Sequence, residues 1–425
     1  MKEDKRAILG WVMFDWANSS YSLVISTAVF PVFFLAATPE EIPIFNFSVY
    51  NSSLYAFSVT FSYILISLLS PVLSGIADHG GKRKFFMRVF TTTGSLACIL
   101  LYFFTGSNNL WIGIIAFIIA TTSHAGSLVF YDAYLPDIAL PEHRDKISAR
   151  GYAFGYIGSV LLLIVNLLVI QKPEWFGISS ENHLPVRLAF LSVGIWWFSF
   201  SQYSFIRLPE DQNVAFDKSQ LFGGLKKLKT AWNHIRHNRD VMYFLFSFFC
   251  YSAGVQTVIY LASAFAQKEL HFESSELILI ILILQIVAIG GAYLFAYISK
   301  LSQNKTSMMI MLCIWILICV LAYLVHSKTQ FYLVAALVGM VLGGIQALSR
   351  SAYSKIIPTE KNLNTCLFSF YDTLYYLSII SGTFTFGIVG QLTGSMRNSV
   401  ISLGIFFIAG LIFLSQVKKS SFLHK

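Results

Sequence analysis

Long apolar segments alternate with short polar ones along nearly the whole chain. A membrane-spanning helix needs roughly 20 mostly apolar residues, and twelve segments reach that length. Their approximate bounds are 7–37, 49–77, 85–105, 109–136, 150–171, 186–206, 241–266, 275–298, 307–326, 330–350, 364–391 and 398–417. Continuous apolar runs favour helices, because a helix satisfies its own backbone hydrogen bonds in lipid. The pattern therefore predicts an all-α membrane protein with twelve transmembrane helices.

The composition points the same way. Hydrophobic residues make up 56% of the chain and charged residues only 12%, whereas a soluble globular protein has about 25% charged residues. The five cysteines fall within predicted spans without a CxxC or Cys/His cluster, which favours packing roles over a metal site or disulfides. We therefore expect a protein embedded in a lipid bilayer, with no metal and no cofactor.

The net charge of +9 follows the topology and does not require a nucleic-acid partner. If the N-terminus is cytoplasmic, 25 of the 30 Lys and Arg residues lie in cytoplasmic segments and 5 lie outside. This asymmetry is the positive-inside rule. We expect a multi-pass protein of the cytoplasmic membrane with both termini in the cytoplasm.

The longest polar segment, residues 207–240, separates six spans from six. It divides the chain into two predicted six-helix bundles, residues 1–206 and 241–425. Inside it, apolar residues recur at spacings of three and four: Leu221, Leu225, Leu228, Trp232 and Ile235. With basic residues between them, they predict an amphipathic helix on the inner leaflet, which could also serve only as a linker.

A faint repeat relates the two halves. AYLPDIALPE follows the fourth span and AYSKIIPTE follows the tenth. Both place Ala-Tyr at a helix end, followed by an Ile, a Pro and a Glu. The same feature at the same place in each half suggests two parallel repeats of six helices.

Asp15 and Asp372 lie well inside predicted spans. An acid near mid-span costs on the order of 2.5–3.5 kcal/mol on insertion scales and usually faces a bundle interior or a wet cavity. Asn18 and Ser22 follow Asp15 at helical spacing, so this polar stripe should face into the bundle. The alternative is that Asp15 caps a helix or pairs with a cation near the inner surface.

Asp132 is the third acid inside a span, but it lies close to the span's end. A surface ion pair with Arg144 or Arg150 is the expected role. No span carries a Lys or Arg near its middle, and Arg350 falls at a predicted end. The two deeper acids therefore lack an obvious fixed counter-ion, which favours a protonatable acid or one that meets a cationic group of a solute.

Further polar side chains complete a candidate pathway. Gln256 and Tyr260 lie in the seventh span, which corresponds to the first in a repeated architecture, and Tyr371 precedes Asp372 in the eleventh. These side chains suit hydrogen bonds to a polar solute. His124, in the fourth span, is a candidate for a proton relay with the two deeper acids, or else a packing histidine.

Between the second and third spans the chain reads SGIADHGGKRK (Ser74–Lys84). It resembles the loop signature of the major facilitator superfamily, in which an Asp is followed by a Gly and then by basic residues. The matching residues are Asp78, Gly81, Lys82 and Arg83. The resemblance implies a part in switching between inward and outward states; an ordinary positive loop is the alternative.

A closer resemblance spans most of the chain. The segments that carry it are FDWANSSYS (residues 14–22), YLPDIA (Tyr134–Ala139), RGYAFGYIGS (Arg150–Ser159) and FGIVGQLTGSMRNS (Phe386–Ser399). Together they are similar to the vacuole-effluxer-like family of the same superfamily, whose bacterial members are mostly of unassigned function. The resemblance implies a twelve-helix carrier, and its fungal relatives imply efflux of amino acids.

The sequence thus predicts a secondary active transporter. It would export a small polar solute, such as an amino acid or related metabolite, by alternating access coupled to protons, and a monomer is expected. The chain contains no P-loop and no catalytic constellation, so an enzyme is not expected. The alternative is a non-transporting receptor or sensor on a carrier scaffold, which would bind a solute without solute flux.

Overall fold

The structure is a computed structural model. It describes residues 4–39, 41–44, 47–211, 219–272, 274–357, 363–393 and 395–422. Among them, twelve helices are long and apolar enough to cross a membrane. The predicted all-α membrane fold is therefore confirmed.

Helices dominate both halves of the chain. The N-terminal half contains α1 (Lys5–Ser20), η1 (Tyr21–Val29), α2 (Phe30–Ala37), α3 (Asn51–Gly80), α4 (Arg83–Leu101), α5 (Leu110–Asp132), α6 (Leu135–Ile138), α7 (Arg144–Gln171) and α8 (Leu184–Arg207). The C-terminal half contains α10 (Arg239–Leu270), α11 (Ser274–Ser302), α12 (Asn304–Leu324), α13 (Lys328–Ile356), α14 (Asn364–Thr393) and α15 (Met396–Gln416). Between the halves lies α9 (Ser219–His237).

Short elements join these helices. An antiparallel hairpin of β1 (Glu41–Ile44) and β2 (Phe47–Tyr50) connects α2 to α3. The 3₁₀ helices are η2 (Ser107–Asn109), η3 (Pro141–His143), η4 (Pro173–Phe176), η5 (Glu181–His183) and η6 (Lys419–Phe422). The hairpin was not predicted; it lies between the helices of the first two spans.

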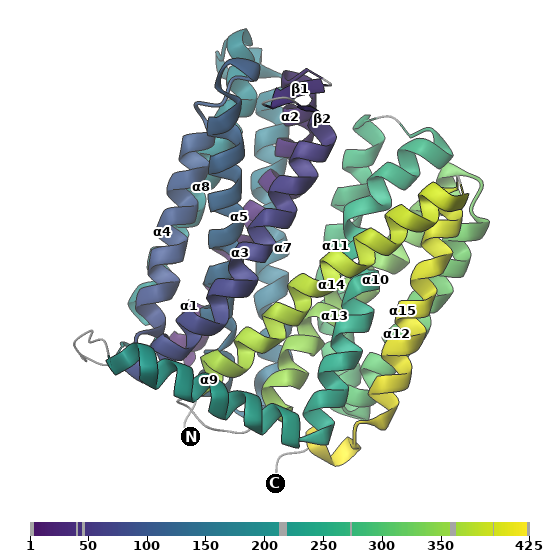
Figure 1. Cartoon of the computed structure of the whole chain (residues 1–425). Helices are drawn as coiled ribbons and strands as arrows, with labels where there is room; N and C mark the ends of the chain where they lie inside the picture. The colour runs from purple at the N-terminus through teal and green to yellow at the C-terminus, as the bar shows by residue number, and fades with distance from the viewer. Residues whose placement is uncertain are drawn as a thin grey trace.

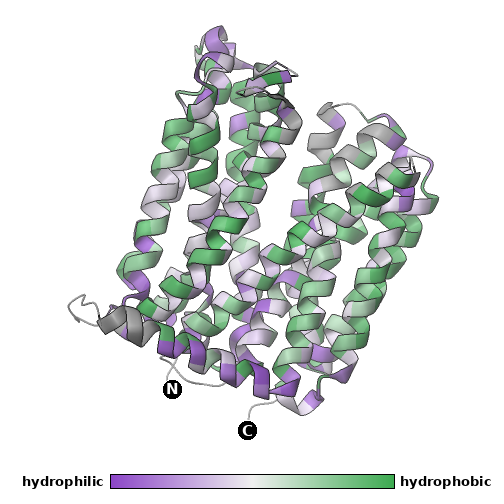
Figure 2. Ribbon diagram, in the orientation of Figure 1, coloured by the Kyte–Doolittle hydropathy of each residue, from purple (hydrophilic) through white to green (hydrophobic). Residues whose placement is uncertain are grey.

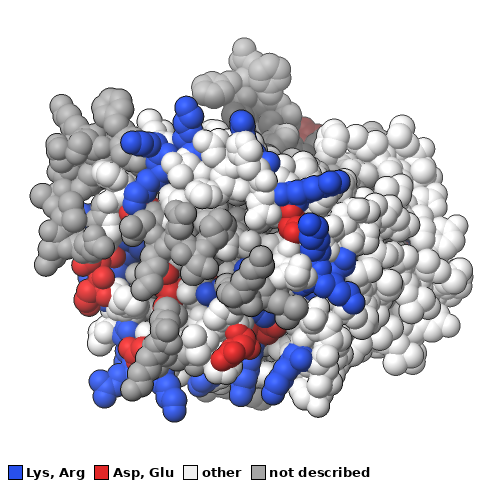
Figure 3. Space-filling model, turned by 90° about the horizontal axis from the view of Figure 1, so that it is seen from below, with Lys and Arg blue, Asp and Glu red and all other residues white. Residues whose placement is uncertain are grey.

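The two halves stand side by side, and α9 runs across the end where both termini lie (Figure 1). The ribbons of the halves come closest at this end and diverge towards the β1–β2 hairpin (Figure 1). Hydrophobic residues follow the length of the spans, whereas hydrophilic residues gather at the helix ends and along α9 (Figure 2). Lys and Arg side chains cluster on the face crossed by α9 (Figure 3).

The first span changes helix type after Ser20. Residues 21–29 form a π-helix, η1, and the Thr27 hydroxyl donates to the Ser22 carbonyl at 2.8 Å. A π-helix has wider turns than an α-helix and often occurs at functional sites. The α-helical spacing that placed Ser22 on the Asp15 face therefore does not continue past Ser20.

The predicted amphipathic helix corresponds to α9. Ala231 and Ile235 are buried, and Trp232 packs on Phe370 of α14 with ring centroids 5.6 Å apart. The Lys227 ammonium donates to the Asp78 carbonyl oxygen at 2.5 Å, and burial lowers the pKa of Lys227. This helix therefore contacts both halves of the protein.

Two parts of the predicted motifs cannot be compared with the structure. Residues 212–218 and the Leu221 side chain lie outside the described residues, as do residues 358–360, the end of the second repeat segment.

Helices α11 and α13 cross at close range beside Gly291. A methyl group on Gly291 would lie 2.0 Å from the Met340 carbonyl oxygen, whereas one on Gly290 would meet no atom within 4 Å. We expect Gly291→Ala to destabilise the protein by about 1–3 kcal/mol, the usual range for overpacking. Thermal melting of the purified protein measures this change.

The neighbouring glycine provides the matched control. Gly290→Ala should leave the melting temperature unchanged or raise it slightly, because Ala favours a helix by about 1 kcal/mol over Gly. Equal melting temperatures for the two variants would contradict the close contact.

Candidate functional site

A buried arginine ties the two halves together. Arg350 of α13 donates to Asp15 of α1 and to Asp132 of α5, at 3.1 Å each. Its Nε donates to the Ser148 hydroxyl of α7 at 3.0 Å, and the Tyr131 hydroxyl donates to Asp15 at 2.7 Å. Arg350 is 2% exposed. Each of the three guanidinium nitrogens therefore already has a partner in the other half.

Aromatic rings surround the same guanidinium. Its central carbon lies 4.5 Å from the Trp11 ring and 4.2 Å from the Tyr152 ring. Arginine above an aromatic face gains cation–π attraction, which is larger where water is excluded. The cluster is therefore held by ion pairs, hydrogen bonds and ring contacts together.

The structure corrects two expectations about these charges. Asp15 has a fixed counter-ion, Arg350, and Asp132 pairs with the same arginine in a buried site instead of with Arg144 or Arg150 at the surface. The reason is the length of the tenth span: α13 continues to Ile356. Arg350 thus lies about 9 Å before the helix end, at 1.5 Å per residue.

Arg144 and Arg150 have other contacts. Arg144 donates to the carbonyl oxygens of Ala139, Pro136 and Ser354. Arg150 lies over the Phe154 ring at 5.3 Å.

A small cavity of about 90 Å³ lies beside this cluster and is lined from both halves. Asp132 and Tyr152 contribute from the N-terminal half. Gln256, Tyr371 and Asp372 contribute from the C-terminal half, so these three predicted residues come together. Sites of drug-sized ligands occupy roughly 300–1,000 Å³, so this cavity suits a small solute or one group of a larger one.

Asp372 is the acid of this cavity that Arg350 does not hold. It is 5% exposed, and its Oδ2 atom is buried without a hydrogen-bond partner among the described residues. A buried polar group without a partner is costly. Such an atom therefore indicates a place where a proton or a ligand belongs.

The other predicted pathway residues lie apart from the cavity. Asn18 is buried with its Nδ2 unpartnered among the described residues, and the Ser22 hydroxyl donates to the Ser19 carbonyl at 3.2 Å. The Tyr260 hydroxyl pairs with that of Tyr63 across the two halves at 3.2 Å.

His124 packs between two aromatic side chains. Its ring centroid lies 5.1 Å from that of Tyr21 and 6.0 Å from that of Trp197. This environment matches a packing histidine. A part in a proton relay stays a prediction.

The end of α3 and the start of α4 hold the start of α14. Asp78 accepts from the Cys366 backbone N–H at 2.9 Å and from the Thr365 hydroxyl at 2.5 Å. Arg83 pairs with Asp78 at 3.4 Å and with Asp137 at 2.6 Å. A carboxylate at a helix N-terminus is stabilised by the helix dipole and by unsatisfied N–H groups. This contact therefore fastens one half to the other at the α9 end.

The remaining two loop residues form the turn itself. Gly81 has a φ of +62°, a left-handed conformation that glycine adopts without steric cost. Lys82 follows as the N-cap of α4, and its backbone N–H donates to the Ala77 carbonyl at 2.9 Å.

A third tie joins α7 to the C-terminal half. Asp145 pairs with Lys355 at 2.8 Å and accepts from Asn304 at 2.8 Å and from Ser299 at 2.9 Å. The Ser351 hydroxyl also donates to it. Together with Asp78 and Arg350, this carboxylate makes a layered polar junction between the halves.

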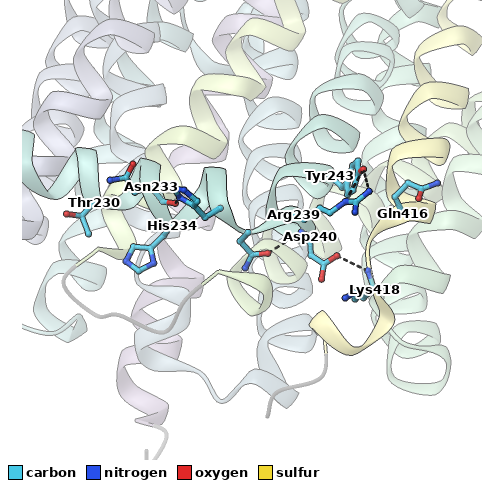
Figure 4. A pocket seen from close by; sticks show the side chains of 10 residues that line it. Thr230, Asn233, His234, Arg239, Asp240, Tyr243, Gln416 and Lys418 are labelled. Atoms are coloured by element: carbon cyan, nitrogen blue, oxygen red, sulfur yellow. Dashed lines mark hydrogen bonds between the residues drawn. The ribbon is translucent and has the colours of Figure 1, made fainter.

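A larger pocket of about 880 Å³ opens at the surface where α9 meets α10 and the end of α15 (Figure 4). Two of its charged side chains already have hydrogen-bond partners: Arg239 donates to the Tyr243 hydroxyl at 2.9 Å, and Asp240 accepts from the Lys418 backbone N–H at 3.2 Å. No described lining residue comes from the N-terminal half. This pocket is therefore not a candidate for the pathway between the halves.

Sequence reasoning missed Arg350, Tyr152 and Gln346 as site residues. All three face the junction: Tyr152 and Gln346 line the cavity, and the Tyr156 hydroxyl donates to Gln346 across the halves. The sequence did contain a pattern that could have indicated two of these residues, Gln346 and Arg350. Gln346 and Arg350 are four residues apart and share one face of their helix.

The fold is shared with solved structures of transporters. The chain matches the major facilitator superfamily transporter FucP in the outward conformation with a TM-score of 0.71 and 13% identity, over 97% of this chain and 98% of that one. It matches the proton:xylose symporter XylE with a TM-score of 0.66 and 14% identity, over 98% and 95%. The chain therefore has the fold of these major facilitator transporters.

Sequence comparison narrows the class further. The profile described as vacuole effluxer Atg22-like matches residues 3–421, and the chain belongs to this family. It is 30% identical to the uncharacterized MFS-type transporter YxiO of Bacillus subtilis, over 99% of this chain and 97% of the relative. It is 26% identical to autophagy-related protein 22 of Pichia angusta, over 84% and 73%. Both predicted resemblances are confirmed.

Proposed function

We propose that this transporter exports a small polar solute in exchange for protons, by alternating access between its two halves. The observation that carries the proposal is the cluster in which Asp15 and Asp132 share one arginine beside a third acid, Asp372, in a cavity lined by both halves. Ionisable groups buried at a carrier's centre mark ion and proton pathways. The family's description as effluxers supports the outward direction.

The layered junction supports a state closed at the α9 end. Asp78, Asp145 and Arg350 all bond across the halves there. Opening that end requires these contacts to break, and protonation of an acid in the cluster would weaken its hold on Arg350. Carriers of this architecture alternate by rocking one bundle against the other about a central site.

The basic face supports the orientation. Lys and Arg gather on the face crossed by α9 (Figure 3), and basic residues favour the cytoplasmic side. We therefore propose that this face and both termini are cytoplasmic. That the protein acts as a monomer is a separate part of the proposal.

The test begins with thermal melting of the purified protein against amino acids, small peptides and amines at pH 5.5 and 7.5. A solute at 100 times its Kd stabilises the folded state by about 2.7 kcal/mol. Flux of a stabilising solute is then measured in liposomes with an imposed pH gradient. The gradient should drive accumulation, and a protonophore should abolish it.

Variants of the cluster assign the coupling group. Because Arg350 holds Asp15 and Asp132, we expect Asp372→Asn to lose accumulation driven by the pH gradient. If only Asp15→Asn loses this accumulation and Asp372→Asn keeps it, Asp15 is the coupling group. Flux that ignores the gradient would contradict proton coupling, and binding without any flux would favour the receptor alternative.

A further inference from the structure

The central cavity carries the chemistry of a cation site. Its lining includes six aromatic side chains: Tyr152, Phe248, Tyr251, Tyr371, Tyr375 and Tyr376. It also includes Asp372, whose buried Oδ2 has no hydrogen-bond partner among the described residues. Aromatic faces and an unpaired carboxylate are the groups that recognise an ammonium ion.

The rings near the cavity already bind one cation. The Arg350 guanidinium lies 4.2 Å from the centroid of Tyr152, a lining residue. Tyr371 is stacked on Phe248 with centroids 3.9 Å apart, which holds the residue preceding Asp372 in place. A ring of this lining is therefore seen to face a cation, and the carboxylates of Asp132 and Asp372 are the negative groups of the same cavity.

A negatively charged solute group has no comparable partner. Among the described residues that line the cavity, none is a Lys or Arg. The nearby Arg350 already donates from all three nitrogens, to Asp15, Asp132 and Ser148. The carboxylate of a zwitterionic amino acid would meet acids and tyrosines here instead of a free cation.

We propose that Asp372 is the counter-ion for the ammonium group of the transported solute, and that the carrier prefers monoamine cations to amino acids. This inference rests on the proposed transport function and narrows its solute class. Gln256 lines the same cavity and offers hydrogen bonds to a hydroxyl or amide of the amine.

In the proposed cycle, the ammonium group and the proton use the same carboxylate in turn. Binding of the amine in its ammonium form to protonated Asp372 forms the ion pair, and the carboxyl proton is released to solution. Other titratable or charged groups surround Asp372. From neighbouring helices they are Asp132 of α5, Tyr152 of α7, Tyr251 of α10, Arg350 and Tyr353 of α13, and Tyr63 of α3, which packs on Tyr376. From α14 itself they are Tyr371, Tyr375 and Tyr376. No described lining residue comes from α9 or α15.

The experiment compares amines with the amino acids that differ from them only by a carboxylate. Tyramine is compared with tyrosine, and isoamylamine with leucine, by thermal melting and calorimetry of the full chain in detergent. We expect each amine to bind at least tenfold more tightly than its partner and to release a proton on binding at pH 5.5. Asp372→Asn should lose amine binding, whereas Glu174→Gln, at an exposed position of η4, should keep it.

The outcomes separate this inference from the transport proposal. Three results would overturn the inference: tighter binding of the amino acids, no binding of either amine, or amine binding that survives in Asp372→Asn. The transport proposal would still stand if flux is driven by a pH gradient. Amine binding that requires Asp372, without flux driven by a pH gradient, would support the inference about the solute and contradict the proposed coupled transport. If Asp372→Asn does not fold, Asp372→Glu is tested instead, because it keeps the charge. This variant should bind isoamylamine with reduced affinity. An unchanged affinity in Asp372→Glu would count against a closely fitted ion pair.

Discussion

Replacing Arg350 by glutamine is expected to abolish transport and to lower the melting temperature of the protein. The substitution leaves Asp15 and Asp132 buried without their shared counter-ion. Breaking a buried ion pair by removing one partner typically costs about 3–5 kcal/mol, because the remaining charge is uncompensated. The measurements are thermal melting of the purified variant and solute flux in liposomes, which should fall at least about 100-fold if that energy is lost from the transport cycle.

Two further variants separate stability from transport. Arg350→Gln combined with Asp132→Asn removes one of the stranded charges and should recover part of the lost melting temperature without restoring transport. Arg150→Gln is the matched control, because Arg150 lies in the same region but over the Phe154 ring. Normal flux in Arg350→Gln would show that the cluster is only structural.

The membrane spans could be predicted from sequence because hydropathy is a property of each segment alone. Twelve predicted spans correspond to twelve helices of sufficient length among the described residues. The ends of the spans are harder to predict than the spans themselves, because polar residues occur both at helix ends and at buried sites close to those ends. Ending the tenth span at Arg350 instead of Ile356 was enough to hide the buried arginine.

The partners of the candidate site residues could not be predicted in the same way. Asp15 and Arg350 are 335 residues apart, and Asp78 and Cys366 are 288 apart. Such pairs depend on which helix faces meet in the folded bundle, which periodicity within one span does not determine. Residues that are neighbours on one helix need no such information: the adjacent Tyr371 and Asp372 both line the cavity.

The π-helix shows a local limit of periodicity. An α-helical spacing placed Ser22 with Asp15 and Asn18, but the wider turns begin at Tyr21. π-helices are rare, and no residue pattern in this span predicts one. The polar stripe is therefore reliable as far as Asn18 and not beyond.

Substituting Asp78 by asparagine is expected to speed chemical labelling of Cys366 from the α9 side of the membrane. Cys366 is buried, and its backbone N–H donates to the Asp78 carboxylate at 2.9 Å. Hydrogen bonds to a charged group contribute about 1.5–3 kcal/mol, and each 1.4 kcal/mol corresponds to about a tenfold change in an equilibrium. If labelling requires the halves to separate at this end, its rate should rise roughly 10–100-fold.

The labelling experiment uses the cysteine already present at this contact. The other four cysteines are replaced by alanine: Cys98, Cys250, Cys313 and Cys319. A membrane-impermeant maleimide is applied to inside-out and to right-side-out vesicles, and Glu142→Gln, an exposed acid, is the control. Faster labelling only in inside-out vesicles would show that Asp78 holds the cytoplasmic end closed. An unchanged rate would mean that Asp145 and Arg350 suffice to keep it closed, and faster labelling only in right-side-out vesicles would reverse the proposed orientation.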